Sequence, residues 1–363
     1  MQVLRLTTFA QDDKLWGHRF SLTVVLVALY TCCAMTRRVL MCAMMFGALA
    51  GAGVSGAETL LVANQHESTL SLIDTASGKV VATVPVGGVT GHEVAVSPDG
   101  KTAYVPIYGN AGVGRAGTDG SEMSVIDLAS RKVGGKVDFG HGVRPHCAVW
   151  DARTGMLLVT TEIDKTVSVI DPKTLKVVGA VPTGQEQSHM LVLSADGKRG
   201  YTANVGPGTV SVLDMVGGKT LAVIPISGNT QRISMSRDGS MVFTSDQTKP
   251  QLAVIDTATN KVKKWVALPA EGYGTATTPD GRWLLVCLRQ AKKVAVVELK
   301  TLEVAKTLDV GDGPSEVVVS PDGKTAYVAC NFSDQVAVVD LGTWKVEKMI
   351  TAGKFADGMA LAR

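Results

Sequence analysis

The sequence predicts an all-β fold, a seven-bladed β-propeller of four-stranded blades, and three observations support this prediction. The decapeptide VSPDGKTAYV occurs twice, at residues 96–105 and 319–328. An alternating apolar segment that ends in an acid occurs seven times. The two ends of the segment 58–363 carry complementary pieces of one such unit. Strand-like units repeated every 40 residues or so are typical of propeller blades.

The seven acids give the repeat its length. Their successive spacings are 53, 44, 43, 42, 42 and 42 residues. Period-2 alternation without a helical segment predicts β-strands. An acid at the end of a strand can accept hydrogen bonds from the backbone of the following turn, so we assign these residues to the fold. They are Asp74, Asp127, Asp171, Asp214, Asp256, Glu298 and Asp340.

The decapeptide predicts the inner hairpin of two blades. Val-Ala-Val alternates as a half-buried strand, Pro98 fixes φ in a turn, and Asp99-Gly100 supply a hydrogen-bond acceptor and a residue that tolerates positive φ. Related Asp-Gly turns lie at 196–197, 238–239, 280–281 and 322–323. The remaining turn, DARTG at 151–155, looks longer, so we expect an irregular blade there.

The order of strands predicts how the ring closes. Each blade has an inner strand before the Asp-Gly turn, a second strand after it, a third ending in the acid, and an outer strand such as KVVATVPV. TLLVANQ, at 59–65, is a second strand without an inner partner, and DGMALAR, at 357–363, is an inner strand without the rest of its blade. We therefore expect one closing blade shared by both segments, which removes exposed sheet edges.

This pattern resembles the YVTN family of seven-bladed propellers, close to the surface-layer, lactonase-like and nitrite-reductase-haem-domain-like propellers. The motifs VSPDGKTAYV, ANVGPGTVSVLD and CNFSDQVAVVD carry the resemblance, which extends over residues 58–363. It implies the fold. Because the shared motifs are turns, and the family includes binding proteins and enzymes, it leaves the function open.

Residues 1–57 predict an export leader. Two apolar runs, 20–35 and 39–54, are each short for a membrane span. Arg37 and Arg38, the second run, and the small residues Ser55 and Ala57 predict a signal peptide at 35–57 that is cleaved after Ala57. Translation from Met1 or from Met35 stays open. We expect a periplasmic or secreted protein, attached to a membrane only through an uncleaved leader or a lipid anchor.

Charge and cysteine content narrow the function classes. The full chain has a formal net charge of +3, but without residues 1–57 it has 31 basic and 31 acidic residues. A broad phosphate-binding surface is therefore unsupported, and no nucleic-acid partner is expected. The three remaining cysteines, Cys147, Cys287 and Cys330, lie in expected strands without CxxC or CxxCH spacing. We interpret them as buried apolar residues and expect no covalent haem.

The starts of the inner strands predict a functional site, because polar residues there differ from blade to blade while the strands recur. Alignment on the strands places one set at a first level: His92, Pro145, His189, Gln231, Tyr273, Ser315 and Asp357. It places another at the next level: Glu93, His146, Met190, Arg232, Gly274, Glu316 and Gly358. By blade topology these starts surround one mouth of the central channel.

The residue types at this mouth indicate a small ligand. Arginine can bind a carboxylate or phosphate through two hydrogen bonds, and tyrosine can stack on a sugar. We therefore expect an anionic or carbohydrate-like ligand, or a loop of a partner protein, and a monomeric protein. The predicted ligand-binding residues are His92, Glu93, Arg144, His146, His189, Gln231, Arg232, Tyr273, Glu316 and Asp357.

A metal site and a mobile flap are further hypotheses. His92, His146 and His189 come from three successive blades and could converge on a divalent metal, although no HxH or HExxH spacing supports this. A loop histidine is more often solvated or bonded to a nearby carbonyl. The segment 106–121, with five glycines, is either a flap over the mouth or an ordinary surface loop.

Two functions compete. The first is a binding propeller. The alternative is a lyase or lactonase-like hydrolase with His92, His146 or His189 as base, Tyr273 as acid, and Arg232 or a metal stabilising the developing negative charge. The sequence has no nucleophile elbow, phosphate-cradling loop or dinucleotide fingerprint. Haem or copper electron transfer is implied only by the resemblance to haem-binding propellers.

Overall fold

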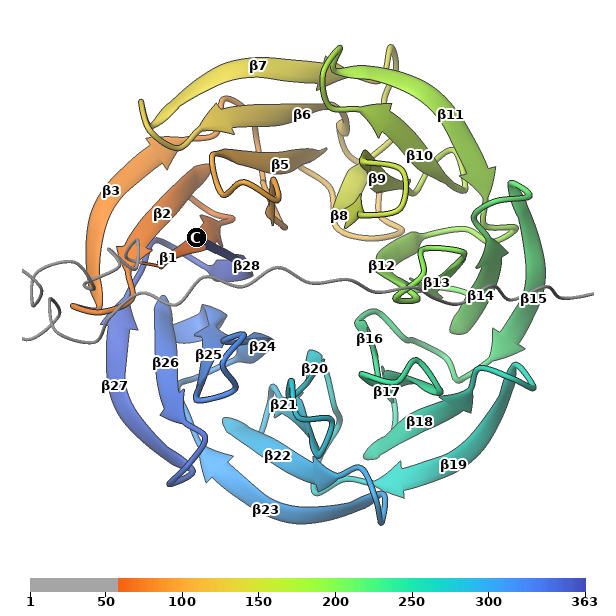
Figure 1. The fold of residues 1–363 in the computed structure, drawn as a ribbon, viewed down its shortest axis with the longest axis vertical. Helices are drawn as coiled ribbons and strands as arrows, with labels where there is room; N and C mark the ends of the chain where they lie inside the picture. The colour runs from red at the N-terminus through yellow and green to blue at the C-terminus, as the bar shows by residue number, and fades with distance from the viewer. Residues whose placement is uncertain (1–57) are drawn as a thin grey trace, which may run out of the picture. The chain divides into compact units, whose positions relative to one another are not determined.

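A computed structural model describes residues 58–363, and these residues form seven four-stranded antiparallel sheets arranged in a ring (Figure 1). The predicted seven-bladed propeller is confirmed. The predicted leader, 1–57, lies outside the described residues. In the part of the chain that is described, no helix is long and apolar enough to cross a membrane.

We number the blades 1 to 7 from the closing blade. Blade 1 contains β28 (Ala356–Ala362), β1 (Thr59–Asn64), β2 (Thr69–Asp74) and β3 (Lys79–Pro85). Blade 2 contains β4 (Ala95–Val96), β5 (Thr102–Gly109), β6 (Asp119–Asp127) and β7 (Lys132–Asp138). Blade 3 contains β8 (Pro145–Asp151), β9 (Met156–Thr161), β10 (Thr166–Asp171) and β11 (Lys176–Pro182).

The other blades repeat this order from the channel outward. Blade 4 contains β12 (Ser188–Leu193), β13 (Arg199–Asn204), β14 (Thr209–Asp214) and β15 (Lys219–Pro225). Blade 5 contains β16 (Ile233–Met235), β17 (Met241–Asp246), β18 (Gln251–Asp256) and β19 (Lys261–Ala267). Blade 6 contains β20 (Thr275–Thr277), β21 (Trp283–Leu288), β22 (Lys293–Glu298) and β23 (Glu303–Asp309). Blade 7 contains β24 (Pro314–Val319), β25 (Thr325–Cys330), β26 (Gln335–Asp340) and β27 (Lys345–Thr351), with a 3₁₀ turn, η1 (Asn331–Ser333), between β25 and β26.

Blade 1 closes the ring as the sequence predicts. The C-terminal strand β28 pairs antiparallel with β1, with Thr59 opposite Ala362 and Leu61 opposite Ala360, and Figure 1 shows blue β28 beside orange β1. The closure joins strands that lie about 300 residues apart, and it covers the edge of β1 with β28, which becomes the innermost strand of the sheet.

The strand-ending acids act within their own turns. Asp74 accepts a hydrogen bond from the Ser77 backbone N–H at 2.7 Å, and Asp256 accepts one from that of Thr259 at 2.8 Å. Hydrogen bonds from Ser77 lower the pKa of Asp74. The structural assignment of these acids is therefore confirmed.

The inner hairpin turns have one length in blades 2 and 3, so the prediction of a longer turn in blade 3 is wrong. Ser97 faces Thr102 across the turn of blade 2 through a 2.8 Å backbone hydrogen bond, and Asp151 pairs with Met156 in blade 3. Four residues connect each pair. Asp151 stands in the place of Ser97, and its carboxylate accepts the Arg153 N–H at 2.9 Å.

The core lies between neighbouring blades, where apolar side chains of adjacent sheets interlock. Between blades 1 and 2, for example, Leu61, Leu70, Val105 and Ile126 are fully buried in one cluster. Cys147, Cys287 and Cys330 are free and buried, in agreement with the sequence interpretation. Burial raises the pKa of the Cys147 thiol to about 12, so this thiol is neutral at physiological pH.

Candidate functional site

Four of the seven inner strands share a backbone irregularity at the face that carries the strand starts, which we call the mouth face. In β12, Ser188 pairs with Asn204 but Met190 pairs with Ala203, so one extra residue lies between them. The same shift occurs in β8, β24 and β28. Such bulges re-aim side chains and are frequent beside functional sites.

This register corrects the alignment of blade 3. Pro145, Ser188, Pro314 and Ala356 occupy equivalent pairing positions. The residues that follow them therefore share one level, which is His146, His189, Ser315 and Asp357. The sequence alignment placed Pro145 at this level and His146 at the next, one residue too far, because Asp151 was not recognised as the counterpart of Ser97. Cys147 takes the position that was assigned to His146.

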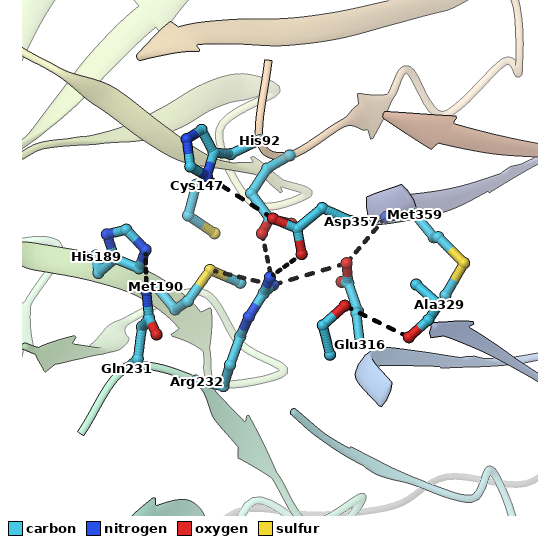
Figure 2. A network of polar contacts seen from close by, with 12 residues as sticks. His92, Cys147, His189, Met190, Gln231, Arg232, Glu316, Ala329, Asp357 and Met359 are labelled. Atoms are coloured by element: carbon cyan, nitrogen blue, oxygen red, sulfur yellow. Dashed lines mark hydrogen bonds and ion pairs between the residues drawn. The ribbon is translucent and has the colours of Figure 1, made fainter. Parts of the chain in front are cut away.

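Arg232 lies at the centre of the mouth (Figure 2). Its guanidinium, 4% exposed on the side chain, lies 2.5 Å from Glu93 Oε1, 2.9 Å from Asp357 Oδ1 and 3.6 Å from Glu316 Oε2. These carboxylates come from blades 2, 1 and 7, while Arg232 precedes β16 of blade 5. The network therefore spans the channel.

Burial and mutual repulsion govern the ionisation of this network. Burial raises the pKa of Glu93 well above its ordinary value, although Arg232 opposes the shift. Burial likewise raises the pKa of Glu316 to about 7. Burial opposes the charge of Arg232, but its three acidic neighbours raise its pKa well above the usual value. Arg232 is therefore a charged group already surrounded by carboxylates, and it is not free to bind an anion.

His92 and His189 each have defined partners. His92 Nε2 lies 2.8 Å from the amide nitrogen of Gln65, and its Nδ1 lies 3.7 Å from Asp357 Oδ2. His189 Nδ1 contacts Glu162, while its Nε2 lies 2.9 Å from the Gln231 amide nitrogen. A carboxylate only accepts, so Nδ1 of His189 carries the proton and Nε2 accepts from Gln231.

His146 lies between these two imidazoles. Its ring centroid is 5.1 Å from that of His92 and 3.4 Å from that of His189. The Nδ1 atom is buried and has no hydrogen-bond partner. Burial lowers the pKa of His146 well below its ordinary value and that of His92 to about 4, so both rings are neutral at physiological pH.

The three histidines come together, but not in the geometry of a metal centre. Across residues 58–363, no group of three or more His, Cys, Asp or Glu side chains is arranged to hold a metal ion. His146 and His189 face each other ring to ring, at an interplanar angle of 31°. Both ring nitrogens of His189 already have partners, so metal binding would first have to break those contacts.

Arg144 is the predicted residue whose role differs most from expectation. Its guanidinium lies 2.5 Å from Asp119 and donates to the carbonyls of Arg115, at 2.7 Å, and Gly112, at 3.4 Å. Arg144 therefore holds the β5–β6 connection. That connection is also shorter than the predicted flap of 106–121, because β5 continues to Gly109 and β6 begins at Asp119.

A cavity of about 380 Å³ lies under this connection. It is lined by Gly114, Arg115, Ala116, Arg144, Glu162, Ile163, Lys165, Glu186 and Gln187. Glu162, which is 3% exposed, joins the cavity to the central network, since it contacts His189 and accepts a 2.7 Å hydrogen bond from Tyr108. The volume falls within the range of ordinary small-molecule sites.

Sequence reasoning missed a third level of residues, those at or just after the end of the second strand. Counted from the start of that strand, the equivalent residues are Gln65, Tyr108, Glu162, Val205, Gln247, Arg289 and Asn331. None recurs in all blades, so the comparison applied to the inner strands could have found them. Gln65 contacts His92, and Glu162 contacts His189.

Tyr273 belongs to an aromatic region of the mouth. The Arg289 guanidinium lies 4.8 Å from the Tyr273 ring centre and 4.7 Å from that of Phe332. The Arg232 guanidinium lies 5.7 Å from the same Tyr273 ring. Burial raises the pKa of Tyr273. The other two histidines of residues 58–363 lie apart from the cluster, with His66 stacked on Phe355 and His141 paired with Asp164.

Comparison with known proteins agrees with this architecture. A family model described as YNCE-like beta-propeller matches residues 269–362. The solved structure of Kuenenia stuttgartiensis hydrazine synthase aligns with a TM-score of 0.67 at 22% identity, over 78% of this chain and 92% of that chain. These matches fit a YVTN-type propeller.

Two further structures carry the same fold. The Pseudomonas aeruginosa periplasmic gluconolactonase PpgL aligns with a TM-score of 0.67 at 19% identity, over 84% of this chain and 99% of that chain. Dihydro-heme d1 dehydrogenase NirN, in complex with DHE, aligns with a TM-score of 0.62 at 15% identity, over 83% and 74%. A search of curated proteins found no match. At these identities the likenesses show the propeller fold and not the ligand.

Proposed function

We propose that this chain is an exported binding protein that holds a small hydroxylated ligand, such as a sugar or a sugar acid, in the mouth-face cavity below the β5–β6 connection. The observation that carries the proposal is the cavity's mixed lining. Arg115 and Lys165 supply donors, while Glu162 and Glu186 supply acceptors. A polyol needs both kinds of partner, because each hydroxyl donates one hydrogen bond and accepts others.

The same lining explains why the ligand is placed away from Arg232. The central network contains three carboxylates around one guanidinium, and adding an anion there would increase repulsion. Lys165 pairs with the exposed Glu186, a contact that a ligand can replace at little cost. A carboxylate on the ligand therefore fits Arg115 and Lys165 at the rim.

Isothermal titration calorimetry with D-gluconate, D-glucose and myo-inositol tests the proposal. We expect at least one probe to bind, and the Arg115→Ala and Lys165→Ala variants to bind it about tenfold more weakly, since a charged hydrogen bond contributes about 1.5 kcal/mol or more. Lys101→Ala, on the opposite face, should leave the affinity unchanged. Absence of binding by all three probes, or equal losses in the Lys101 variant, would contradict the proposal.

A lactonase-like activity is the second candidate, and His146 favours it. The Nδ1 atom of this neutral ring has no hydrogen-bond partner and can accept a proton from a water molecule that reaches it, although burial lowers the pKa of His146 and so weakens it as a base. The water oxygen would then bond to the lactone carbonyl carbon, the ring C–O bond would break, and the proton would pass to the released alkoxide. Hydrolysis of δ-gluconolactone above the spontaneous rate, lost in His146→Gln but not in Lys101→Ala, would support this activity.

Export rests on the leader residues. Arg37 and Arg38, the apolar run and the Ser55–Ala57 ending support cleavage after Ala57. Mass spectrometry of the exported protein should find an N-terminus at Glu58 or within a few residues of it. Soluble cytoplasmic protein that retains Met1 would contradict export.

A further inference from the structure

A second cavity lies on the face opposite the mouth, which we call the turn face because it carries the inner hairpin turns. It has a volume of about 620 Å³ and lies between the turns of blades 5 and 6. Three basic side chains line it: Arg237 and Arg282, from the two hairpin turns, and Lys300, from the turn after β22. Leu299, buried at 7% exposure, forms part of its apolar wall.

The acids of this cavity are already engaged. Asp238 Oδ1 accepts hydrogen bonds from the Ser236 hydroxyl at 2.6 Å and the Ser240 N–H at 3.0 Å. Asp280 Oδ1 accepts from the Thr278 hydroxyl at 2.5 Å and the Arg282 N–H at 3.0 Å. Burial opposes the shift at Asp280, but these bonds hold the pKa of both aspartates below the ordinary value. Each carboxylate therefore belongs to its own turn.

The basic groups, in contrast, are not paired with these acids at contact distance, although the charge of Arg282 also lowers the pKa of Asp280. Within residues 58–363, Arg237, Arg282 and Lys300 form no ion pair. The Arg282 guanidinium lies 4.6 Å from the centre of the Trp283 ring, a contact that leaves its N–H groups available. Three cations line the cavity against two aspartates that are held in their own turns, so an excess of positive charge remains and favours an anion.

Comparison among blades shows that the fold does not require Arg237. The residues at its position in the other hairpin turns are Pro98, Ala152, Ala195, Pro279 and Pro321. The turn forms the same serine–aspartate hydrogen bond with arginine as with proline, as Ser236 and Ser97 show. The cavity between the turns of blades 3 and 4 has a single basic side chain in its lining, that of Arg153. Arg237 is therefore available for another purpose.

We propose that this cavity binds a small oxyanion that carries two or more negative charges, of the phosphate or polycarboxylate class. Arg237 and Arg282 would each hold the anion through paired N–H donors, and Lys300 would add a third positive charge. Leu299 and Met241 supply apolar contact for the carbon skeleton of an organic anion. The site is independent of the mouth-face cavity.

Calorimetric titration of the protein with inorganic phosphate and with citrate, at low ionic strength, tests the site. We expect saturable one-to-one binding of at least one of these anions. Affinity should fall at least tenfold in Arg237→Pro, which installs the residue that three other hairpin turns carry, and in Arg282→Ala. Thermal unfolding of both variants checks that the fold is retained, and Arg282→Ala keeps the test valid if the proline disturbs the turn.

Two controls separate specific binding at this cavity from a general attraction between the protein and anions. Lys101→Ala removes the counterpart of Arg282 from the Pro98 turn and should leave anion binding unchanged. Lys324→Ala, at the equivalent position of the Pro321 turn, is exposed and lines neither cavity, so it should also leave anion binding unchanged. Absence of saturable binding by the unmodified protein would overturn the proposal. So would an affinity in Arg237→Pro and Arg282→Ala that equals the affinity of the unmodified protein. Equal loss in Lys101→Ala would overturn it as well, since it would indicate a diffuse charge effect.

Discussion

The two ends of the inner strands differ in how their polar groups are organised. At the turn face, a hydroxyl donates to the aspartate two residues on in five blades, at 2.5 Å for Ser97–Asp99 and 2.7 Å for Ser320–Asp322. At the mouth face, no two blades place the same pair of residues at the two levels. Repetition therefore marks the contacts that every blade needs in order to fold, and difference marks the positions that are free for binding.

The two ends also differ in the range of their contacts. The turn-face bonds join residues two to five positions apart, so each can form as soon as its own hairpin does. At the mouth, Arg232 contacts Glu93 and Asp357, 139 and 125 positions away. Such contacts exist only when the ring is closed, because loop closure over these lengths must come first.

Deletion of Asp357–Arg363 should cause the largest loss of stability, because it removes nearly all of one inner strand, including its contacts at both faces. It removes most of β28, exposes the edge of β1, and takes Asp357 away from Arg232. We expect the loss to exceed the total stability of an ordinary domain, about 5–15 kcal/mol, so that cooperative unfolding disappears. Circular dichroism during heating provides the measurement. Deletion of Arg363 alone is the control, and a heptapeptide deletion that melts like the full protein would disprove the closure.

Arg232→Met should have the next largest effect, because it leaves Glu93, Glu316 and Asp357 buried without their cation. Breaking a buried ion pair from one side destabilises a protein by about 3–5 kcal/mol. The loss should be smaller at pH 5 than at pH 8, since protonation neutralises the carboxylates whose pKa is already raised. Urea unfolding at both pH values measures it, with the exposed Arg237→Met as control. A loss that does not depend on pH would show that the three acids are not the cause.

The contrast between the two ends of the inner strands also explains which features of the structure could be predicted from the sequence. The fold depends on local turn chemistry, and dipeptides such as Asp99-Gly100 and Asp322-Gly323 are enough to predict a hairpin turn at their positions. Repetition then supplied the blade number and the closure of β28 on β1. The one error of register arose at Asp151, where a different residue makes the turn and so hides the correct alignment of His146.

The sequence could group the candidate residues at one mouth of the channel, but it could not predict their contacts. The mouth and its non-recurring residues follow from strand order. The partners of each side chain depend on distances across the ring, which no local pattern encodes. Arg144 and Arg232 were expected to meet a ligand, yet one holds a connection and the other is surrounded by carboxylates. Glu162 was missed because only inner-strand starts were compared.

Glu316→Gln should change the pH dependence of stability at the mouth by a smaller amount. The pKa of Glu316 is raised from 4.5 to about 7 in the folded protein. The folded protein therefore binds a proton at this carboxyl more tightly than the unfolded protein does. The stability that it contributes is present below pH 4.5 and is lost as the pH rises through about 7. Between pH 5 and pH 8, the free energy of unfolding of the variant should therefore rise by about 1–2 kcal/mol relative to that of the unmodified protein.

Chemical unfolding at pH 5 and pH 8 measures this gain as a difference between the two proteins. Protonation of His92, whose folded pKa of about 4 shifts stability in the opposite sense, occurs in both proteins and cancels in the difference. Glu303→Gln, an exposed position on β23, is the matched control and should show no change with pH. A difference for Glu316→Gln that is constant from pH 5 to pH 8 would contradict a raised pKa at this position.

Asp322→Ala and Asp99→Ala should have the smallest effects on stability. If the two decreases in melting temperature are equal, the turns of the two blades are equivalent, as the comparison between the two faces requires. Both aspartates lie in the decapeptide VSPDGKTAYV, and both accept from a serine hydroxyl, at 2.7 and 2.5 Å, and from a lysine N–H, at 3.0 and 3.2 Å. Each variant should lower the melting temperature by about 2 °C, because an exposed turn bond contributes little and the chain is long. These bonds lower both pKa values, so each effect should vanish as the pH falls through the folded pKa. Differential scanning calorimetry can resolve such shifts. Effects that differ severalfold between the two blades would mean that the turns are not equivalent, and repetition could then no longer separate folding residues from binding residues.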